Sequence, residues 1–137
     1  MAIAGLITGY VSLAILPLVV LVLGGAIVLT RNVSETAKLT RIDAEFASIG
    51  NSLRMYKLNN NTYPTTAQGL RALVDRPVST PVPRRWTQLM TAVPKDPWNN
   101  EYEYRFPGRK DQTEYELISR GKDGVLGTVD DLSSQDD

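Results

Sequence analysis

The chain has 137 residues, with 15 basic and 15 acidic side chains, no histidine and no cysteine. A formal net charge of zero gives no basic field, so we expect no nucleic-acid partner. The absence of histidine removes the usual general base, and the absence of cysteine removes any disulfide framework. Histidine and cysteine are also the commonest zinc ligands. Any bound metal is therefore expected to be held by oxygen, as calcium or magnesium is.

The first thirty residues are strongly apolar. No charged side chain lies between Ala2 and Thr30, and all charged residues fall between Arg31 and Asp137. A helix of this length extends roughly 40 Å, enough to cross a hydrocarbon core of about 30 Å. We therefore predict a transmembrane helix over 1–30, in contact with the lipid bilayer. A cleaved secretory signal fits less well, because no basic residues precede the apolar region.

An amphipathic segment follows without a break. Its apolar residues recur at steps of 4, 3, 4 and 3, which is one stripe of an α-helix. The stripe consists of Ile42, Phe46, Ile49, Leu53 and Tyr56. We predict that the helix continues over about 31–60, and that it ends at the asparagines of 59–61, which tolerate the left-handed conformation.

Two less regular segments come next. The stretch "YPTTAQGLRALV" predicts a turn and a second short helix, in which Thr65 or Thr66 is the cap and Leu70 and Leu73 face inward. The stretch "DRPVSTPVPRRW" contains three prolines and is predicted to be an extended loop.

Strand patterns dominate the last third of the chain. In "EYEYRF", residues 101–106, aromatic and charged residues alternate, and "EYELIS", residues 114–119, is strand-like as well. The intervening "PGRKDQ" is a plausible hairpin loop. Two strands alone are marginal, so we expect them to pack across the amphipathic helix. The predicted fold is α+β, a long helix on a small antiparallel sheet.

Three segments resemble one known family in their order and spacing: "MYKLNNNTYPTTAQGLRALV", "VPKDPWNNEYEYRFPG" and "YELISRGKDGVLGTVDDL". They are similar to the major pseudopilins of type II secretion systems, which are pilin-like proteins, over about residues 42–132. The family combines a Tyr-Pro-Thr-Thr-x-x-Gly-Leu turn, an Asp-Pro-Trp loop and an Asp-Gly-rich calcium loop near the carboxyl end.

The resemblance implies a single-pass inner-membrane protein whose α+β head, residues 31–137, lies in the periplasm. It also implies a structural role. Such subunits polymerise through their amino-terminal helices into a homo-oligomeric filament, together with other pseudopilins. A cytoplasmic ATPase drives the assembly through an inner-membrane platform, and folded proteins leave through an outer-membrane secretin. The subunit itself is not an enzyme.

The resemblance further implies a Ca²⁺ site in "GKDGVLGTVDDL", residues 121–132. The side chains on the family's calcium-binding positions are those of Asp123, Asp130 and Asp131. Main-chain ligation is implied for Arg120, with Val125 and Thr128 as further candidates. The composition agrees, because calcium takes 6 to 8 oxygen ligands and the glycines at 121, 124 and 127 permit the turns that bring them together. The alternative is a solvated acidic tail.

Two features bear on the side of the membrane that the head occupies. Arg31, Lys38 and Arg41 follow the predicted span, and the positive-inside rule alone would hold them in the cytoplasm. A weak calcium loop works only where free calcium is high, which favours a head outside the cytoplasm.

The amino terminus departs from the family. Its precursors carry a glycine cleavage site and a glutamate at the fifth mature position, whereas Gly5 is followed here by "LITGY" and Gly9 by "YVSLA". No acidic residue precedes Glu35. The resemblance is therefore to a family member with a divergent amino terminus.

Two alternatives remain open. One is a membrane-anchored, pilin-like binding module that forms no filament, with Trp86 and Trp98 in its recognition surface. The other is a hydrolase that uses Asp96 paired with Glu101 or Glu103. A solvated sheet face explains these glutamates more simply.

Overall fold

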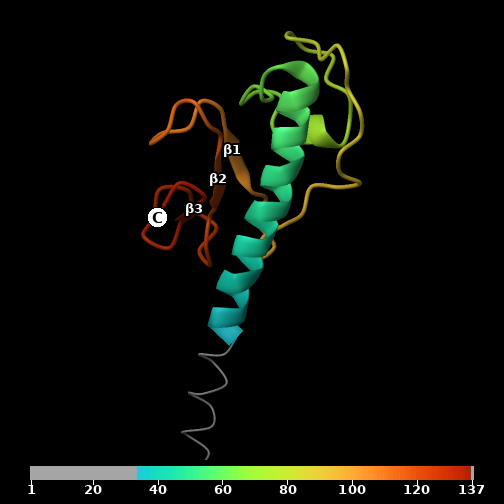
Figure 1. Ribbon diagram of the computed structural model, residues 1–137. Coiled ribbons are helices and arrows are strands. Elements are labelled where there is room, and N and C mark those ends of the chain that lie inside the picture. Colours follow the sequence, from blue (N-terminus) through green and yellow to red (C-terminus); the bar gives the residue numbers. More distant parts are fainter. Residues whose placement is uncertain (1–33, 137) are drawn as a thin grey trace, which may run out of the picture. The chain divides into compact units, whose positions relative to one another are not determined.

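The computed structural model describes residues 34–136 (Figure 1). The predicted transmembrane helix over 1–30 lies outside the described residues. Within 34–136, no helix combines the length and the apolar character needed to cross a membrane. The fold below belongs to the unit Thr40–Asp137.

Residues 34–60 are helical, and the predicted apolar stripe faces the core. Ile42, Ile49 and Leu53 are at most 1% exposed, so this face is removed from water. The helix ends as predicted: Asn61 adopts a φ of 65°, and its N–H still donates to the Lys57 carbonyl oxygen at 2.7 Å.

The predicted second helix is a single 3₁₀ turn, η1, Leu70–Leu73. Its N-cap is Gly69, which makes no side-chain cap hydrogen bond, so the predicted cap at Thr65 or Thr66 is wrong. Thr65 instead forms a reciprocal pair with Gln68 in the preceding turn, in which each side-chain oxygen accepts the other's backbone N–H at 3.2 and 3.1 Å. Gly69 then breaks the helical path with a φ of 60°, which leaves only four residues for η1. Leu70 and Leu73 are buried, as their spacing predicts.

The sheet has three antiparallel strands in the order β1-β2-β3: β1 Glu103–Arg105, β2 Glu116–Ser119 and β3 Leu132–Ser133. The predicted hairpin is confirmed by the pairing of Tyr104 with Leu117. The third strand was not predicted from the sequence; it pairs Ser133 with Ile118. Figure 1 shows the three strands on one side of the helix and the η1 region on another.

Aromatic rings fill the space between helix and sheet. Tyr63 lies edge-on to Phe106 and to Tyr115, with ring centroids 5.2 Å apart in both pairs. The buried phenol groups of Tyr104 and Tyr102 both have hydrogen-bond partners. The Tyr104 hydroxyl donates to the Pro64 carbonyl at 2.8 Å, and the Tyr102 hydroxyl donates to the carboxylate of Glu45 on the helix. Burial raises the pKa of Tyr104 far above its ordinary value, so this ring stays neutral.

Candidate metal-binding loop

The start of the loop 121–132 is held by a group of contacts around a buried carboxylate, that of Asp96. Asp96 is 2% exposed, and its Oδ1 accepts the backbone N–H groups of Trp98 and Asn100 at 3.0 and 2.8 Å. Its Oδ2 accepts the Ser119 hydroxyl at 2.7 Å. Asn100 then donates Nδ2 to the Gly121 carbonyl at 2.9 Å, which fixes the first residue of the loop against the Asp-Pro-Trp turn.

Inside the loop, two aspartates converge on one hydroxyl. Thr128 Oγ1 lies 2.7 Å from Asp130 Oδ1 and 3.3 Å from Asp123 Oδ1, and 3.0 Å from the Val125 carbonyl oxygen. The second oxygen of Asp130 accepts the N–H groups of Lys122 and Asp123 at 2.8 and 3.1 Å. The hydroxyl of Thr128 and these N–H groups hold the pKa of Asp130 below its usual range.

Asp131 has a different environment. Its Oδ2 accepts the Gly127 N–H at 2.6 Å, whereas its Oδ1 is buried and has no hydrogen-bond partner within 34–136. A buried, unsatisfied carboxylate oxygen is costly, because it has lost its hydration without a replacement. This oxygen is therefore the part of the loop that a cation would satisfy.

Glycine is required at the start of the loop. Gly121 has a φ of 60°, and a Cβ built on it would lie 2.3 Å from the backbone oxygen of Asp130. A side chain here would force the two ends of the loop apart. The left-handed φ values of Gly124 and Gly127, 69° and 95°, fit the predicted turns.

The loop's donor set consists of oxygen atoms, which suits a hard divalent cation. Within residues 34–136, no three acidic side chains lie close enough together to hold a metal ion, so the structure does not bring Asp123, Asp130 and Asp131 to one point. A site here would therefore combine carboxylates with hydroxyl or main-chain oxygens. Of the predicted residues, the structure brings Asp123, Val125, Thr128 and Asp130 together, and places Asp131 beside Gly127.

Arg120, predicted for main-chain ligation, precedes the loop and is anchored by its side chain. The Nη2 of Arg120 donates to Oε2 of Glu103, the first residue of β1, at 2.8 Å. Sequence reasoning missed the anchoring residues Asp96, Asn100 and Ser119. The signal for the turn was present, since Asp-Pro-Trp-Asn-Asn is typical of a turn in which the aspartate accepts later backbone N–H groups.

Two of the groups considered for hydrolysis have structural contacts: Asp96 accepts backbone and hydroxyl donors, and Glu103 pairs with Arg120. Glu101 is exposed and lies in an isolated backbone bridge with Lys95, outside the three strands. Trp86 donates its indole N–H to the Ala72 carbonyl at 2.8 Å, as a core-packed ring would.

Comparison with known proteins decides the family. The family model described as type II secretion system (T2SS), protein G matches residues 29–135. The chain belongs to this family. Among its relatives are the type II secretion system core proteins G of Aeromonas hydrophila, 39% identical over 102 residues, and of Pseudomonas aeruginosa, 41% identical over 98 residues. The alignments cover 73% and 70% of this chain, and 70% and 68% of those proteins.

A solved structure confirms the fold. The major pseudopilin from the type 2 secretion system of enterohaemorrhagic Escherichia coli is 37% identical and superposes with a TM-score of 0.69. The match covers 74% of this chain and 89% of that one. The predicted α+β pseudopilin fold is therefore correct, as is the family suggested by the sequence motifs.

Proposed function

We propose that the chain is a structural subunit of a type II secretion pseudopilus, which polymerises through its amino-terminal helix and helps to move folded proteins across the outer membrane. The similarity of its head, in sequence and in fold, to the major pseudopilin of Escherichia coli carries this proposal. Its partners are other copies of the chain, other pseudopilins and the inner-membrane platform. It has no catalytic role.

The proposal includes a membrane anchor and a location. The uncharged stretch 1–30 crosses the inner membrane once, and the head lies in the periplasm. This assignment rests on the length and composition of the apolar stretch and on the family to which the chain belongs.

The proposal also includes calcium. Asp123, Asp130 and Asp131 would hold the ion, with Thr128, Val125 and the Arg120 carbonyl as further oxygen ligands. The buried, unsatisfied Oδ1 of Asp131 supports this assignment, as does the convergence of two carboxylates on Thr128. When bound, the ion would tie both ends of the loop together and stabilise the head.

Cross-linking between copies tests the filament. The native chain has no cysteine, so a pair of cysteines introduced on the outer face of the helix, at Leu39 and Leu58, reports only contacts between copies. Both side chains are exposed, 46% and 78%. In a filament, oxidation should give a ladder of homo-oligomers. A membrane-anchored binding module that does not polymerise should stay monomeric under the same oxidation, and that result would refute the proposed function.

A further inference from the structure

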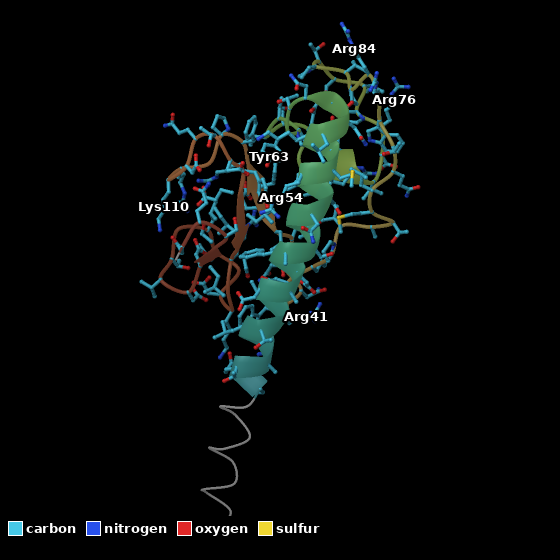
Figure 2. All side chains as sticks on the ribbon, in the orientation of Figure 1. Arg41, Arg54, Tyr63, Arg76, Arg84 and Lys110 are labelled. Carbon is cyan, nitrogen blue, oxygen red and sulfur yellow. The ribbon has the colours of Figure 1, made fainter. Side chains whose placement is uncertain are left out.

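A cleft of about 400 Å³ lies where the long helix ends. One wall consists of residues 59–63 and the other of residues 81–85, which include Arg84 and Arg85. Arg76 reaches the same segment and donates Nη2 to the Pro83 carbonyl at 3.3 Å. Figure 2 places Arg76 and Arg84 at the end of the helix remote from Arg41. We call this surface the arginine cleft.

The three arginines of the cleft lack acidic partners. Within residues 34–136, none of Arg76, Arg84 and Arg85 forms a salt bridge, and all three are exposed. Most other cations of the head do pair with a carboxylate: Lys38, Arg41, Lys57, Arg71, Arg109, Lys110 and Arg120. Positive charge therefore accumulates at this end of the head without internal neutralisation.

The segment that carries the arginines is held in place although it has no regular secondary structure. Asn60 Oδ1 accepts the Arg85 N–H at 3.0 Å. Gln68 Nε2 donates to the carbonyl oxygens of Ser79 and Pro81 at 2.9 and 3.0 Å. Since the backbone is already ordered, a ligand here would lose less free energy to loop ordering than on a mobile loop.

Exposed apolar side chains accompany the arginines. Val82 lines the cleft with Arg84 and Arg85 and is 49% exposed, and Val78 lines a second hollow with Arg76 and is 92% exposed. Arginine next to exposed apolar residues is typical of a protein-binding surface, because the guanidinium fork matches a carboxylate and the valines can be covered by apolar side chains. A polyphosphate would leave the valines in water.

We propose that the arginine cleft binds an acidic segment of a partner protein. Carboxylates of that segment pair with Arg84 and Arg85, and an apolar side chain between them covers Val82. The contact is separate from the calcium loop and from polymerisation through the helix, so it can hold where either of those assignments fails.

A defined peptide tests this surface. The full-length chain in detergent micelles is titrated against a fluorescein-labelled octapeptide of alternating glutamate and valine, with anisotropy as the readout. We expect saturable binding that weakens at least tenfold in the double variant Arg84→Glu, Arg85→Glu. Raising the ionic strength from about 0.1 to 1 M should also weaken it, because the Debye length falls from about 10 to 3 Å.

The matched control is Arg54→Glu with Lys95→Glu. It makes the same change in net charge at two exposed cations outside the cleft, and it should bind within twofold of wild type. Thermal melting shows whether each variant is folded; Arg84→Gln with Arg85→Gln replaces the first variant if that one is not. An equal loss of affinity in the control would overturn the proposal. So would equal binding of a glutamine–valine octapeptide, stronger binding of anionic phospholipid vesicles or of a DNA oligonucleotide, or self-association of the chain that is lost in Arg84→Glu, Arg85→Glu.

Discussion

One atom of Asp131 supports the proposed cation site. Its Oδ1 is buried without a hydrogen-bond partner in the described part of the chain, while Asp123 and Asp130 accept N–H and hydroxyl donors. A carboxylate that is desolvated and unsatisfied destabilises the folded state unless a cation or a donor reaches it. Under the proposed function, calcium would remove this penalty, and the stability of the loop would then depend on the ion.

Removal of the ligands should therefore abolish calcium-dependent stabilisation. At about 100 times its dissociation constant, one bound ion stabilises the native state by roughly 2.7 kcal/mol, a rise in Tm of more than about 10 °C for a head of this size. In Asp123→Asn and Asp130→Asn, we expect the melting curves in calcium and in chelator to coincide. Melting is followed by circular dichroism on the full-length chain.

The control for this experiment is Asp111→Asn, an exposed aspartate outside the loop that accepts the Thr113 N–H and hydroxyl. This variant should keep the full calcium effect. Wild-type protein that melts at the same temperature with calcium and with chelator would refute the metal assignment.

The turns of the loop and the Asp-Pro-Trp turn were predictable, whereas the contacts that join these two segments were not. Glycine and aspartate at short spacing predict tight turns and oxygen ligands from their own chemistry. The anchoring contacts join Ser119 to Asp96 and Gly121 to Asn100, each across more than twenty positions, and such pairing cannot be read from a local pattern. Sequence reasoning therefore treated Asp96 as a candidate acid, and only the fold shows it as an anchor.

A close contact joins the helix to Tyr115, the residue that precedes β2. Gly50 lies on the buried face of the helix, and a Cβ built on it would lie 2.3 Å from the Tyr115 hydroxyl oxygen and 3.5 Å from its Cζ. Glycine inside a helix costs up to about 1 kcal/mol relative to alanine. The position is therefore held by packing, because the ring needs the space that a methyl group would fill.

A double-mutant cycle tests this contact. Gly50→Ala should lower the free energy of unfolding, although alanine is the better helix former, because the new methyl group collides with the Tyr115 hydroxyl. In the background of Tyr115→Phe the collision is absent, and the same substitution should stabilise by up to about 1 kcal/mol. Urea unfolding measures the four variants. Equal effects of Gly50→Ala in both backgrounds would contradict the packing argument.

A second link between elements is the buried carboxylate of Glu116 on β2. It is 1% exposed and accepts hydrogen bonds from Arg109 Nη2 at 2.8 Å and from the Ser133 hydroxyl at 2.9 Å. Burial alone would raise the pKa of Glu116, but the bonds from Arg109 and Ser133 outweigh it and leave that pKa below its usual value. Glu116 therefore holds the hairpin loop and β3 to the central strand only when it is ionised.

The stabilisation by Glu116 depends on pH in a definite direction. Because the pKa of Glu116 is lowered on folding, its contribution is complete above the unfolded value of about 4.3 and disappears as the pH falls through the folded pKa. Glu116→Gln should cost roughly 1–3 kcal/mol at pH 7, and the gap to wild type should begin to narrow once the pH falls below the unfolded value of about 4.3. Melting curves between pH 3 and 7 measure it. Glu114→Gln, a more exposed partner of Lys57, is the control and should cost less; a gap that stays constant with pH would contradict the role of ionisation.

The two outer strands show where sequence patterns work and where they stop. β1 was predictable because Tyr102 and Tyr104 alternate with charged residues, and the tyrosines are indeed buried. β3 has two residues, and it forms only because Ser133 pairs with Ile118 and the Ser134 N–H donates to the Leu117 carbonyl at 2.8 Å. Such a strand depends on pairing with the other strands of the sheet, so no alternating pattern in the sequence predicts it.

At the scale of the whole molecule, the chain combines an uncharged stretch with a charged head that carries its own core. All 30 charged residues, the 15 basic and 15 acidic side chains together, follow residue 30. If the stretch 1–30 spans the inner membrane, the head must lie wholly on one side of it, and calcium binding would require the periplasmic side, where free calcium is high. The position of one exposed head residue therefore decides the orientation of the whole protein.

Cysteine labelling in intact cells tests this orientation. Val129 is fully exposed, and the native chain has no cysteine, so Val129→Cys introduces the single reactive thiol of the protein. A maleimide that crosses a permeabilised outer membrane but not the inner membrane should label it before lysis, to the same extent as after lysis. Ile118→Cys, at a side chain that is 0% exposed, should resist labelling until the protein is denatured, which controls for unfolding. Labelling of Val129→Cys only after lysis would place the head in the cytoplasm, where a weak calcium loop would stay empty and a secretion filament could not form.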